Sequence, residues 1–155
     1  MDYEHTQYGP LWLTVAATTI GLWIAAWFVP QVQMQRILLL AGGALCVVSL
    51  SFHHLTIRDE GEHLLLFFGP LPVFRRRLLY DRIERVEQAR STFLDGWGIH
   101  VSPGGGWVWN LWGFDCVDVW HSGGRKLRIG TDDPTGLAEF LKQRMSTAAD
   151  STESR

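Results

Sequence analysis

The chain has 155 residues, of which 46% are hydrophobic and 19% are charged, and its formal net charge is −2. This length allows one modest domain and a membrane segment. The balanced charge excludes a strongly basic protein that binds nucleic acid through its overall field. Beyond residue 52 the chain carries 13 Lys and Arg against 14 Asp and Glu, so any attraction to an anionic partner must be local.

The first predicted membrane helix covers residues 11–29 and follows a short N-terminal tail, residues 1–10. No charged residue occurs between Thr6 and Gln35. As a helix, residues 11–29 would be about 28 Å long, which is enough to cross the hydrocarbon core of a bilayer. Pro30 is expected to end this helix.

The second predicted membrane helix covers residues 37–52, about 24 Å long, after a polar connector at residues 31–36. A cleaved signal peptide is excluded because the N-terminus carries Asp2 and Glu4 but no Lys or Arg, and because the apolar core is too long. Two spans place both chain ends on one side of the membrane. The weak Lys and Arg bias predicts that side to be the cytoplasmic face of a bacterial inner membrane.

Small residues recur in both predicted helices. Ala17, Gly21 and Ala25 are spaced by four, and Gly42-Gly43-Ala44 lies in the second helix. Such residues let helix backbones approach closely, either within the hairpin or between two copies of the chain. No ionisable residue lies in the middle of either span, which argues against a transport pathway.

Residues 55–130 alternate β-type runs with turn signals, and two hairpins keep their apolar residues on one face. A two-residue turn at Glu60-Gly61 would pair Ile57 with Leu64, and Leu55 with Leu66.

The second hairpin has a three-residue loop at residues 122–124. It would pair Val119 with Leu127 on one face and Asp118 with Arg128 on the other, in solvent.

The remaining predicted strands cover residues 73–80, 83–90, 98–102 and 107–111, the last two joined by Pro103-Gly104-Gly105-Gly106. Asp133-Pro134 then predicts the start of an amphipathic helix whose apolar face is formed by Leu137, Phe140, Leu141 and Met145. Residues 146–155 are polar and unpatterned, and we expect them to be disordered. The only two cysteines, Cys46 and Cys116, do not predict a disulfide framework.

The stretch LTIRDEGEHLLLFFGPLPVFRRRLLYDRIERVE, followed by GWGI, GGGWVWNLWG and VDVWHSGGRKLRIGTDDPTGLAEFLK, resembles the bacterial membrane-anchored pleckstrin-homology-like (PH-like) family. The likeness covers roughly residues 37–145 by pattern. It implies an α+β protein with an N-terminal two-helix transmembrane hairpin (residues 11–52). After the hairpin it implies a PH-like antiparallel β-barrel of about seven strands with a C-terminal capping helix (residues 53–145). It implies no site residue.

An apolar loop that runs into three arginines is the first candidate site. Phe and Leu side chains could enter the membrane interface while the arginines meet lipid phosphates. An ordinary hairpin turn, with Phe68 and Phe74 in the core and the arginines paired to Asp81, Glu84 or Glu87, explains the pattern equally well. The candidate lipid contacts are Phe67, Phe68, Leu71, Phe74, Arg75, Arg76 and Arg77.

A tryptophan cluster is the second candidate, because aromatic residues gather at interfaces. Core packing or contact between protomers explains the cluster better than a ligand site does. The cluster comprises Trp97, Trp107, Trp109, Trp112 and Trp120.

Catalysis and metal binding have weaker support. His100, Asp115 and Cys116 would be the residues of an enzyme site, but no histidine or cysteine has the spacing of metal ligands, and Cys116 is expected on the outward face of its strand. We therefore predict no catalytic residues, no metal and no cofactor.

The sequence favours a membrane-tethered, non-enzymatic interaction module that binds a protein partner, its own copies or anionic lipid head groups. The alternative is an accessory subunit of a membrane enzyme or transporter, held through its helices.

Overall fold

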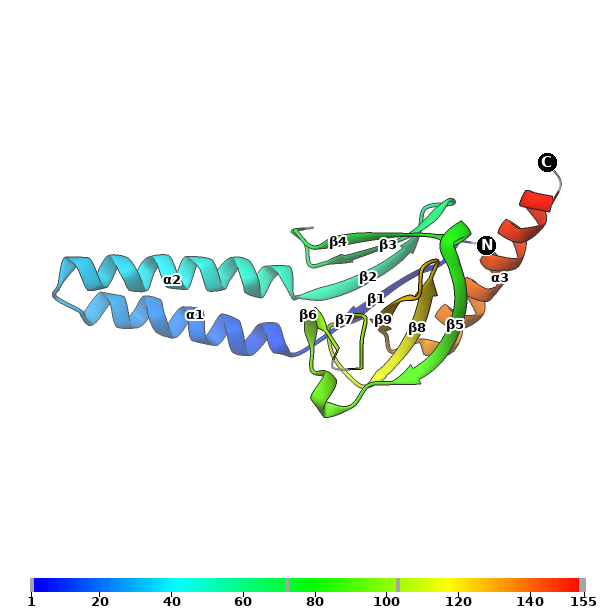
Figure 1. The fold of residues 1–155 in the computed structure, drawn as a ribbon. Helices are drawn as coiled ribbons and strands as arrows, with labels where there is room; N and C mark the ends of the chain where they lie inside the picture. The colour runs from blue at the N-terminus through cyan, green and yellow to red at the C-terminus, as the bar shows by residue number, and fades with distance from the viewer. Residues whose placement is uncertain (1, 72, 103, 154–155) are drawn as a thin grey trace.

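The computed structural model of the chain describes residues 2–71, 73–102 and 104–153. An apolar helical hairpin projects from a domain of two β-sheets, and a C-terminal helix lies at the far end (Figure 1). In chain order the elements are β1 (Glu4–Tyr8), α1 (Leu11–Phe28), α2 (Val32–Ser51), β2 (His54–Asp59), β3 (His63–Phe68), β4 (Arg75–Leu79), η1 (Tyr80–Arg82), β5 (Ile83–Arg90), η2 (Phe93–Asp95), β6 (Gly98–Val101), β7 (Trp107–Asn110), β8 (Asp115–His121), β9 (Arg125–Gly130) and α3 (Pro134–Glu153), where η marks a single 3₁₀ turn.

Helices α1 and α2 have 18 and 20 residues and are long and apolar enough to cross a membrane. At 1.5 Å per residue they measure about 27 and 30 Å. The predicted connector at residues 31–36 is wrong in its extent, because α2 already begins at Val32. Pro30 and an extended Gln31 suffice to reverse the chain.

The two helices pack through small and polar residues. Gly42 is buried against the indole of Trp23, and the Ser49 hydroxyl donates to the Trp12 carbonyl at 2.9 Å. The stripe formed by Ala17, Gly21 and Ala25 does not join this contact and is exposed along its length. Packing within the hairpin therefore uses the small residues of α2 but leaves those of α1 open.

The N-terminal residues form an edge strand, so the expectation of a tail at residues 1–10 is wrong. Strand β1 pairs antiparallel with β2, from Glu4 opposite Arg58 to Tyr8 opposite His54. The Tyr3 ring stacks on Phe140 of α3 at 5.1 Å. The helical hairpin is thus an insertion between two neighbouring strands, and residues 4–8 lie on the same side of it as the rest of the domain.

The strands form two sheets and not the closed antiparallel barrel that we expected. The first sheet has the order β1-β2-β3-β4 and the second β5-β8-β9-β7-β6, with β7 parallel to β9. The turn η1 carries the chain from β4 into the second sheet, so β4 and β6 are left as edges that do not pair with each other. An open rim therefore separates these two edges.

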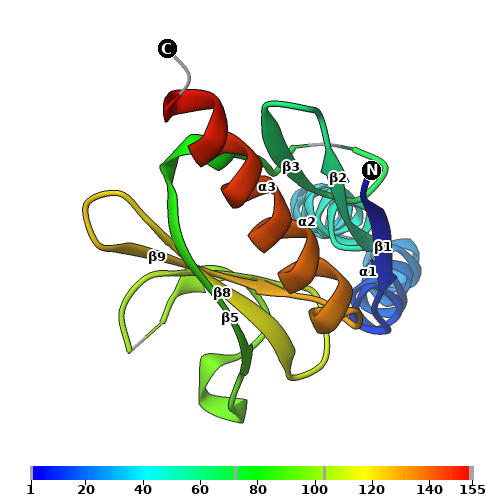
Figure 2. The same ribbon diagram turned by 90° about the vertical axis from the view of Figure 1, so that its right-hand side faces the viewer.

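The core lies between the sheets and is covered by α3, as expected for a capping helix (Figure 2). Leu137 and Leu141 are fully buried, Phe140 is nearly so, and Met145 packs at the margin. The Asp133 carboxylate caps the helix by accepting from the Gly136 N–H at 3.0 Å. Helix α3 continues to Glu153, beyond residue 145, at which we expected the capping helix to end. This segment contains no glycine or proline that would stop a helix.

One predicted hairpin register is confirmed and the other is shifted. In β8–β9, Val119 faces Leu127 and Asp118 faces Arg128, as predicted. In β2–β3, Ile57 faces Leu66 and not Leu64, a shift of two residues. A two-residue shift keeps every apolar side chain on the same face, so the hydrophobic pattern could not distinguish the two registers.

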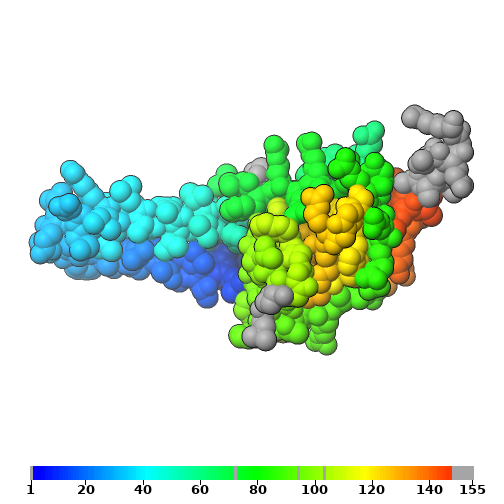
Figure 3. Space-filling model, in the orientation of Figure 1, coloured from blue at the N-terminus to red at the C-terminus, as the bar shows by residue number. Residues whose placement is uncertain are grey.

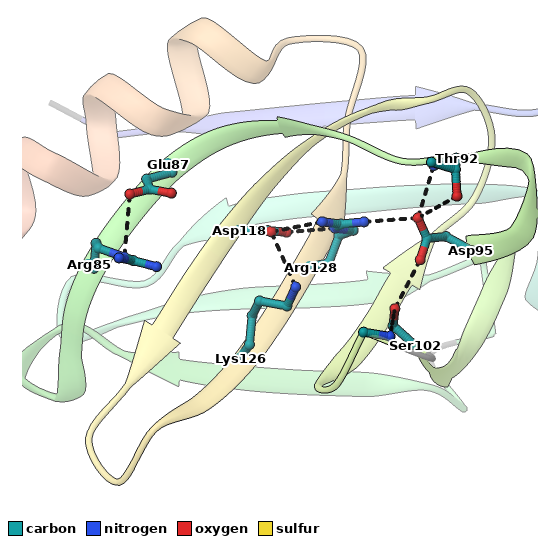
Figure 4. A network of polar contacts seen from close by, with 9 residues as sticks. Arg85, Glu87, Thr92, Asp95, Ser102, Asp118, Lys126 and Arg128 are labelled. Carbon is teal, nitrogen blue, oxygen red and sulfur yellow. Dashed lines mark hydrogen bonds and ion pairs between the residues drawn. The ribbon is translucent and has the colours of Figure 1, made fainter.

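The Asp118–Arg128 pair is buried, contrary to the expectation that it faces solvent. The guanidinium donates to both Asp118 oxygens at 2.7 and 2.9 Å and to Asp95 Oδ2 at 3.0 Å (Figure 4). Asp95 also accepts from the backbone N–H of Thr92, the largest of several contacts that lower the pKa of its carboxyl group. The segment around η2 covers this face of the second sheet. It also helps to explain why Cys116, expected on an outward face, is fully buried.

Substituting Tyr3 by Ala tests whether β1 is docked. The loss of the stack on Phe140 and of the hydrogen bond to Asp133 should lower the free energy of unfolding by about 2 kcal/mol. Tyr3→Phe keeps the stack and should lose about 1 kcal/mol. Urea unfolding of the full chain in detergent, followed by tryptophan fluorescence, measures both. An unchanged midpoint for Tyr3→Ala would show that β1 does not contribute to the fold.

Substituting Arg128 by Met tests the buried network. Two carboxylates would lose their main counter-charge in a site where the three side chains are only 6–14% exposed. The expected cost is about 3–5 kcal/mol in the same assay. The control Arg90→Met removes a pair with Asp115 whose side chains are 77% and 60% exposed, and should cost under about 0.5 kcal/mol. Equal costs for the two variants would contradict burial of the network.

Candidate functional site

The loop that joins β3 to β4 lies beside the base of α2. Gly69 is buried at a φ of +65°, and a β-carbon there would clash with the carbonyl oxygens of Leu50 and Ser51 at the end of α2. The Phe74 ring lies 5.6 Å from that of Phe52, the residue that follows α2. The predicted lipid-contact loop is therefore held at the end of the domain from which the helices emerge (Figure 1).

The predicted contact residues of this loop divide between core and surface. Phe68 is fully buried, and Phe67 is half-buried beneath the Arg58 guanidinium. Leu71 and Phe74 are 42% and 39% exposed. Val73, which the sequence did not single out, is 61% exposed. Pro72 lies outside the described residues.

The three arginines alternate along β4. Arg75 and Arg77 are exposed, whereas Arg76 is half-buried and points to the inner face, the side of Leu78. Among the described residues none of the three forms an ion pair with the acidic residues that follow. Glu87, one of the expected partners, pairs instead with Arg85 at 3.4 Å. The alternative in which Arg75, Arg76 and Arg77 form ion pairs with Asp81, Glu84 or Glu87 is therefore not found among the described residues.

The tryptophans do not form one cluster. Trp109 is buried in the core, and Trp97 stacks on Trp112 at 4.6 Å. Trp107 is 46% exposed, and Trp120 lies beneath the Arg85 guanidinium at 3.7 Å.

The Trp97–Trp112 stack belongs to a second apolar patch, at the base of α1. Gly9 packs against Trp112, and Gln7 of β1 donates to the Trp112 carbonyl at 2.9 Å. Phe93 meets the edge of Trp97 and is 76% exposed. Sequence reasoning missed Phe93, because its position depends on the turn η2 rather than on a periodic pattern.

A groove follows the open rim between β4 and β6–β7. Its helix-proximal part is a cavity of about 280 Å³ lined by Val73, Phe74, Arg75, Arg76, Ile99, Trp107 and Trp109. The adjoining part, of about 540 Å³, is lined by Arg76, Val101, Gly104, Gly105, Gly106, Trp107, Trp120, Gly124, Arg125 and Lys126. Arg76 and Trp107 belong to both parts, so the groove runs from an apolar end beside α2 to a cationic end. Pro103 of the predicted turn lies outside the described residues.

Arg76, Arg125 and Lys126 gather at the cationic end of the groove. Burial lowers the pKa of Arg76, and the charge of Arg125 lowers it further. Burial likewise lowers the pKa of His121, with a further contribution from both arginines. The Lys126 ammonium group forms an ion pair with Asp118, with Nζ 3.5 Å from Oδ2.

Of the residues considered for an enzyme site, Cys116 is buried and Asp115 is exposed. Burial raises the pKa of the Cys116 thiol, which disfavours the thiolate that a nucleophile requires. Asp115 is exposed beside Arg90. Within residues 2–71, 73–102 and 104–153, no three His, Cys, Asp or Glu side chains gather as a metal site.

Comparison with protein-family models, with curated proteins and with solved structures gave no match.

Proposed function

We propose that this protein is a membrane-tethered, non-enzymatic module whose helix-proximal face contacts lipid head groups. In this proposal α1 and α2 cross a bacterial inner membrane, and the two-sheet domain lies against its cytoplasmic face. We also propose that the domain is a PH-like fold. Two stacked sheets with a C-terminal helix over one opening are consistent with that relationship.

One observation carries the proposal: exposed apolar side chains gather at the end of the domain where the helices emerge. Leu71, Val73 and Phe74 lie beside the base of α2, and Phe93 with the Trp97–Trp112 stack lies beside the base of α1. Exposure of these side chains to water costs free energy and favours aggregation, whereas their burial at a bilayer interface is favourable.

The exposed arginines of β4 add an electrostatic contribution. Arg75 and Arg77 follow the apolar loop directly. Near an anionic membrane surface each basic residue contributes about 1 kcal/mol. Apolar residues at the level of the interface, followed by cations, match the order of acyl chain and phosphate in the bilayer.

The short junctions between helices and strands support a fixed orientation. Only Gly9 and Pro10 separate β1 from α1, and only Phe52 and His53 separate α2 from β2. Such short connections prevent the domain from moving away from the helix bases. The apolar patches must therefore stay close to the interface whenever the helices span the bilayer.

Fluorescent labelling of the full chain in nanodiscs tests this proposal. Single cysteines at Val73 and Phe93, in a chain with Cys46→Ala and Cys116→Ala, would carry an environment-sensitive dye. We expect blue-shifted emission and quenching by lipids that bear a spin label at head-group depth, because both sites should lie in the interface.

The matched control is the same dye at Glu62, an exposed residue in the β2–β3 turn. Strand β2 runs away from α2 for six residues, which places this turn about 17 Å or more farther from the helices. The Glu62 label should be neither shifted nor quenched. Identical emission and quenching at all three sites would refute the interfacial contact.

A second candidate function is an accessory subunit held through its helices. The specific observation is the exposed stripe of Ala17, Gly21 and Ala25, because small residues on an open helix face allow another helix to approach closely. Such a subunit would contact a membrane enzyme or transporter, or a second copy of this chain.

Substituting Gly21 by Leu tests the second candidate. The bulk would block a helix that packs on the stripe, so crosslinking in the membrane to a partner or second copy should fall at least severalfold. The control is Gly43→Leu in α2, where a β-carbon meets nothing within 4 Å. If the two variants crosslink to the same extent as the unaltered chain, the stripe is not a contact surface.

A further inference from the structure

The cationic end of the groove has the features of an anion site. Three basic side chains, Arg76, Arg125 and Lys126, line it together with no carboxylate among the lining residues. Within the described part of the chain neither arginine forms an ion pair. Arg76 is half-buried and sits close enough to Arg125 to feel its charge. Two neighbouring guanidinium groups without a counter-charge repel each other, and an anion bound between them would relieve this repulsion.

The three cations come from different parts of the fold. Arg76 points inward from the edge strand β4, whereas Arg125 and Lys126 begin β9. Figure 3 shows the yellow-to-orange β8–β9 hairpin beside the yellow-green segment that carries β6 and β7. Arg76 is about 50 residues from Arg125 and Lys126 in the sequence. The three side chains therefore come together through the tertiary fold and not through a local run of basic residues.

The walls of the groove leave room for a group larger than a single ion. Trp107 contributes a partly exposed aromatic face, and Gly104–Gly106 contribute backbone without side chains. Gly106 has a φ of +90°, and a β-carbon there would lie 2.5 Å from the Lys126 carbonyl oxygen, so only glycine fits. The hydrogen bonds between Ser102 and Gly105 and between Ser102 and Gly106, both 2.9 Å, hold this turn closed.

We propose that this groove binds a phosphate ester, with Arg76 and Arg125 as its paired charged donors and Lys126 as the third cation. Guanidinium groups match the several oxygens of a phosphate better than they match a single charge. The apolar end at Val73, Phe74 and Ile99 would accept the organic part of the ester.

The ester has two sources, a lipid head group or a soluble phosphate compound. The proximity of the apolar end to α2 favours the lipid head group. If the ester is a lipid head group, the inference rests on the proposed membrane function; if it is a soluble compound, the inference is independent of that function.

The test uses the full chain in nanodiscs and two probes. The soluble probe is glycerol 3-phosphate, titrated by calorimetry into protein in phosphatidylcholine discs. The lipid probe is phosphatidic acid in the disc, read by phosphorus NMR. We expect Arg76→Gln and Arg125→Gln each to weaken binding of the bound probe about tenfold or more, because each removes a charge-assisted contact.

Arg82→Gln is the matched control. It lies in the turn η1 that follows β4, makes the same change of charge and is absent from the groove lining. It should change binding by less than about twofold. Equal weakening by all three variants would mean a diffuse charge effect and would overturn the proposal, as would the failure of both probes to bind. Binding of phosphatidic acid alone would assign the ester to a lipid, and binding of glycerol 3-phosphate alone to a soluble compound.

Stability measurements separate lost binding from lost folding. Because Arg76 and Arg125 repel each other, Arg76→Gln should leave the unliganded domain at least as stable as the unaltered chain. A destabilised Arg76→Gln domain would indicate a structural role and would overturn the proposal. The dye shifts at residues 73 and 93 do not depend on Arg76, so the groove can fail while the interfacial contact holds.

Discussion

The pairing of β1 with β2 is the constraint on which the rest of this structure depends. A helical hairpin inserted between two hydrogen-bonded neighbours leaves both of its ends fastened to one sheet. A domain on a single flexible linker could take any orientation. Here the two anchor points lie side by side, and only one end of the domain faces the bases of the helices. Leu71, Val73, Phe74 and Phe93 are exposed at that end.

The second sheet packs against other parts of the domain on both of its faces. One face packs on the core and on α3. The segment around η2 covers the Arg128 network on the other face. The unpaired edges of β4 and β6 border the groove, where pairing would otherwise have filled the space.

Much of the architecture follows from local patterns in the sequence. Apolar runs predicted both helices, alternation predicted the register of β8–β9, and Asp133-Pro134 predicted the start of α3. Strand β1 was missed because EHTQY is a polar edge strand whose partner lies beyond both helices.

The burial of Arg128 was missed because its cover, Asp95, lies 33 residues away in a turn without periodicity. The groove was missed because Arg76, Trp107 and Arg125 are far apart in the sequence and line one groove only in the folded domain. Both of these misses concern contacts between segments distant in the chain. The β2–β3 register was missed for a different reason, because a shift of two residues leaves the apolar face unchanged.

The last pair of the β1–β2 ladder, Tyr8 opposite His54, means that residues 9–53 stand topologically in the place of a hairpin turn. A two-residue turn such as Asn-Gly joins antiparallel neighbours of this kind. The helical hairpin is therefore modular: we expect a chain in which such a turn replaces it to retain the complete four-stranded sheet.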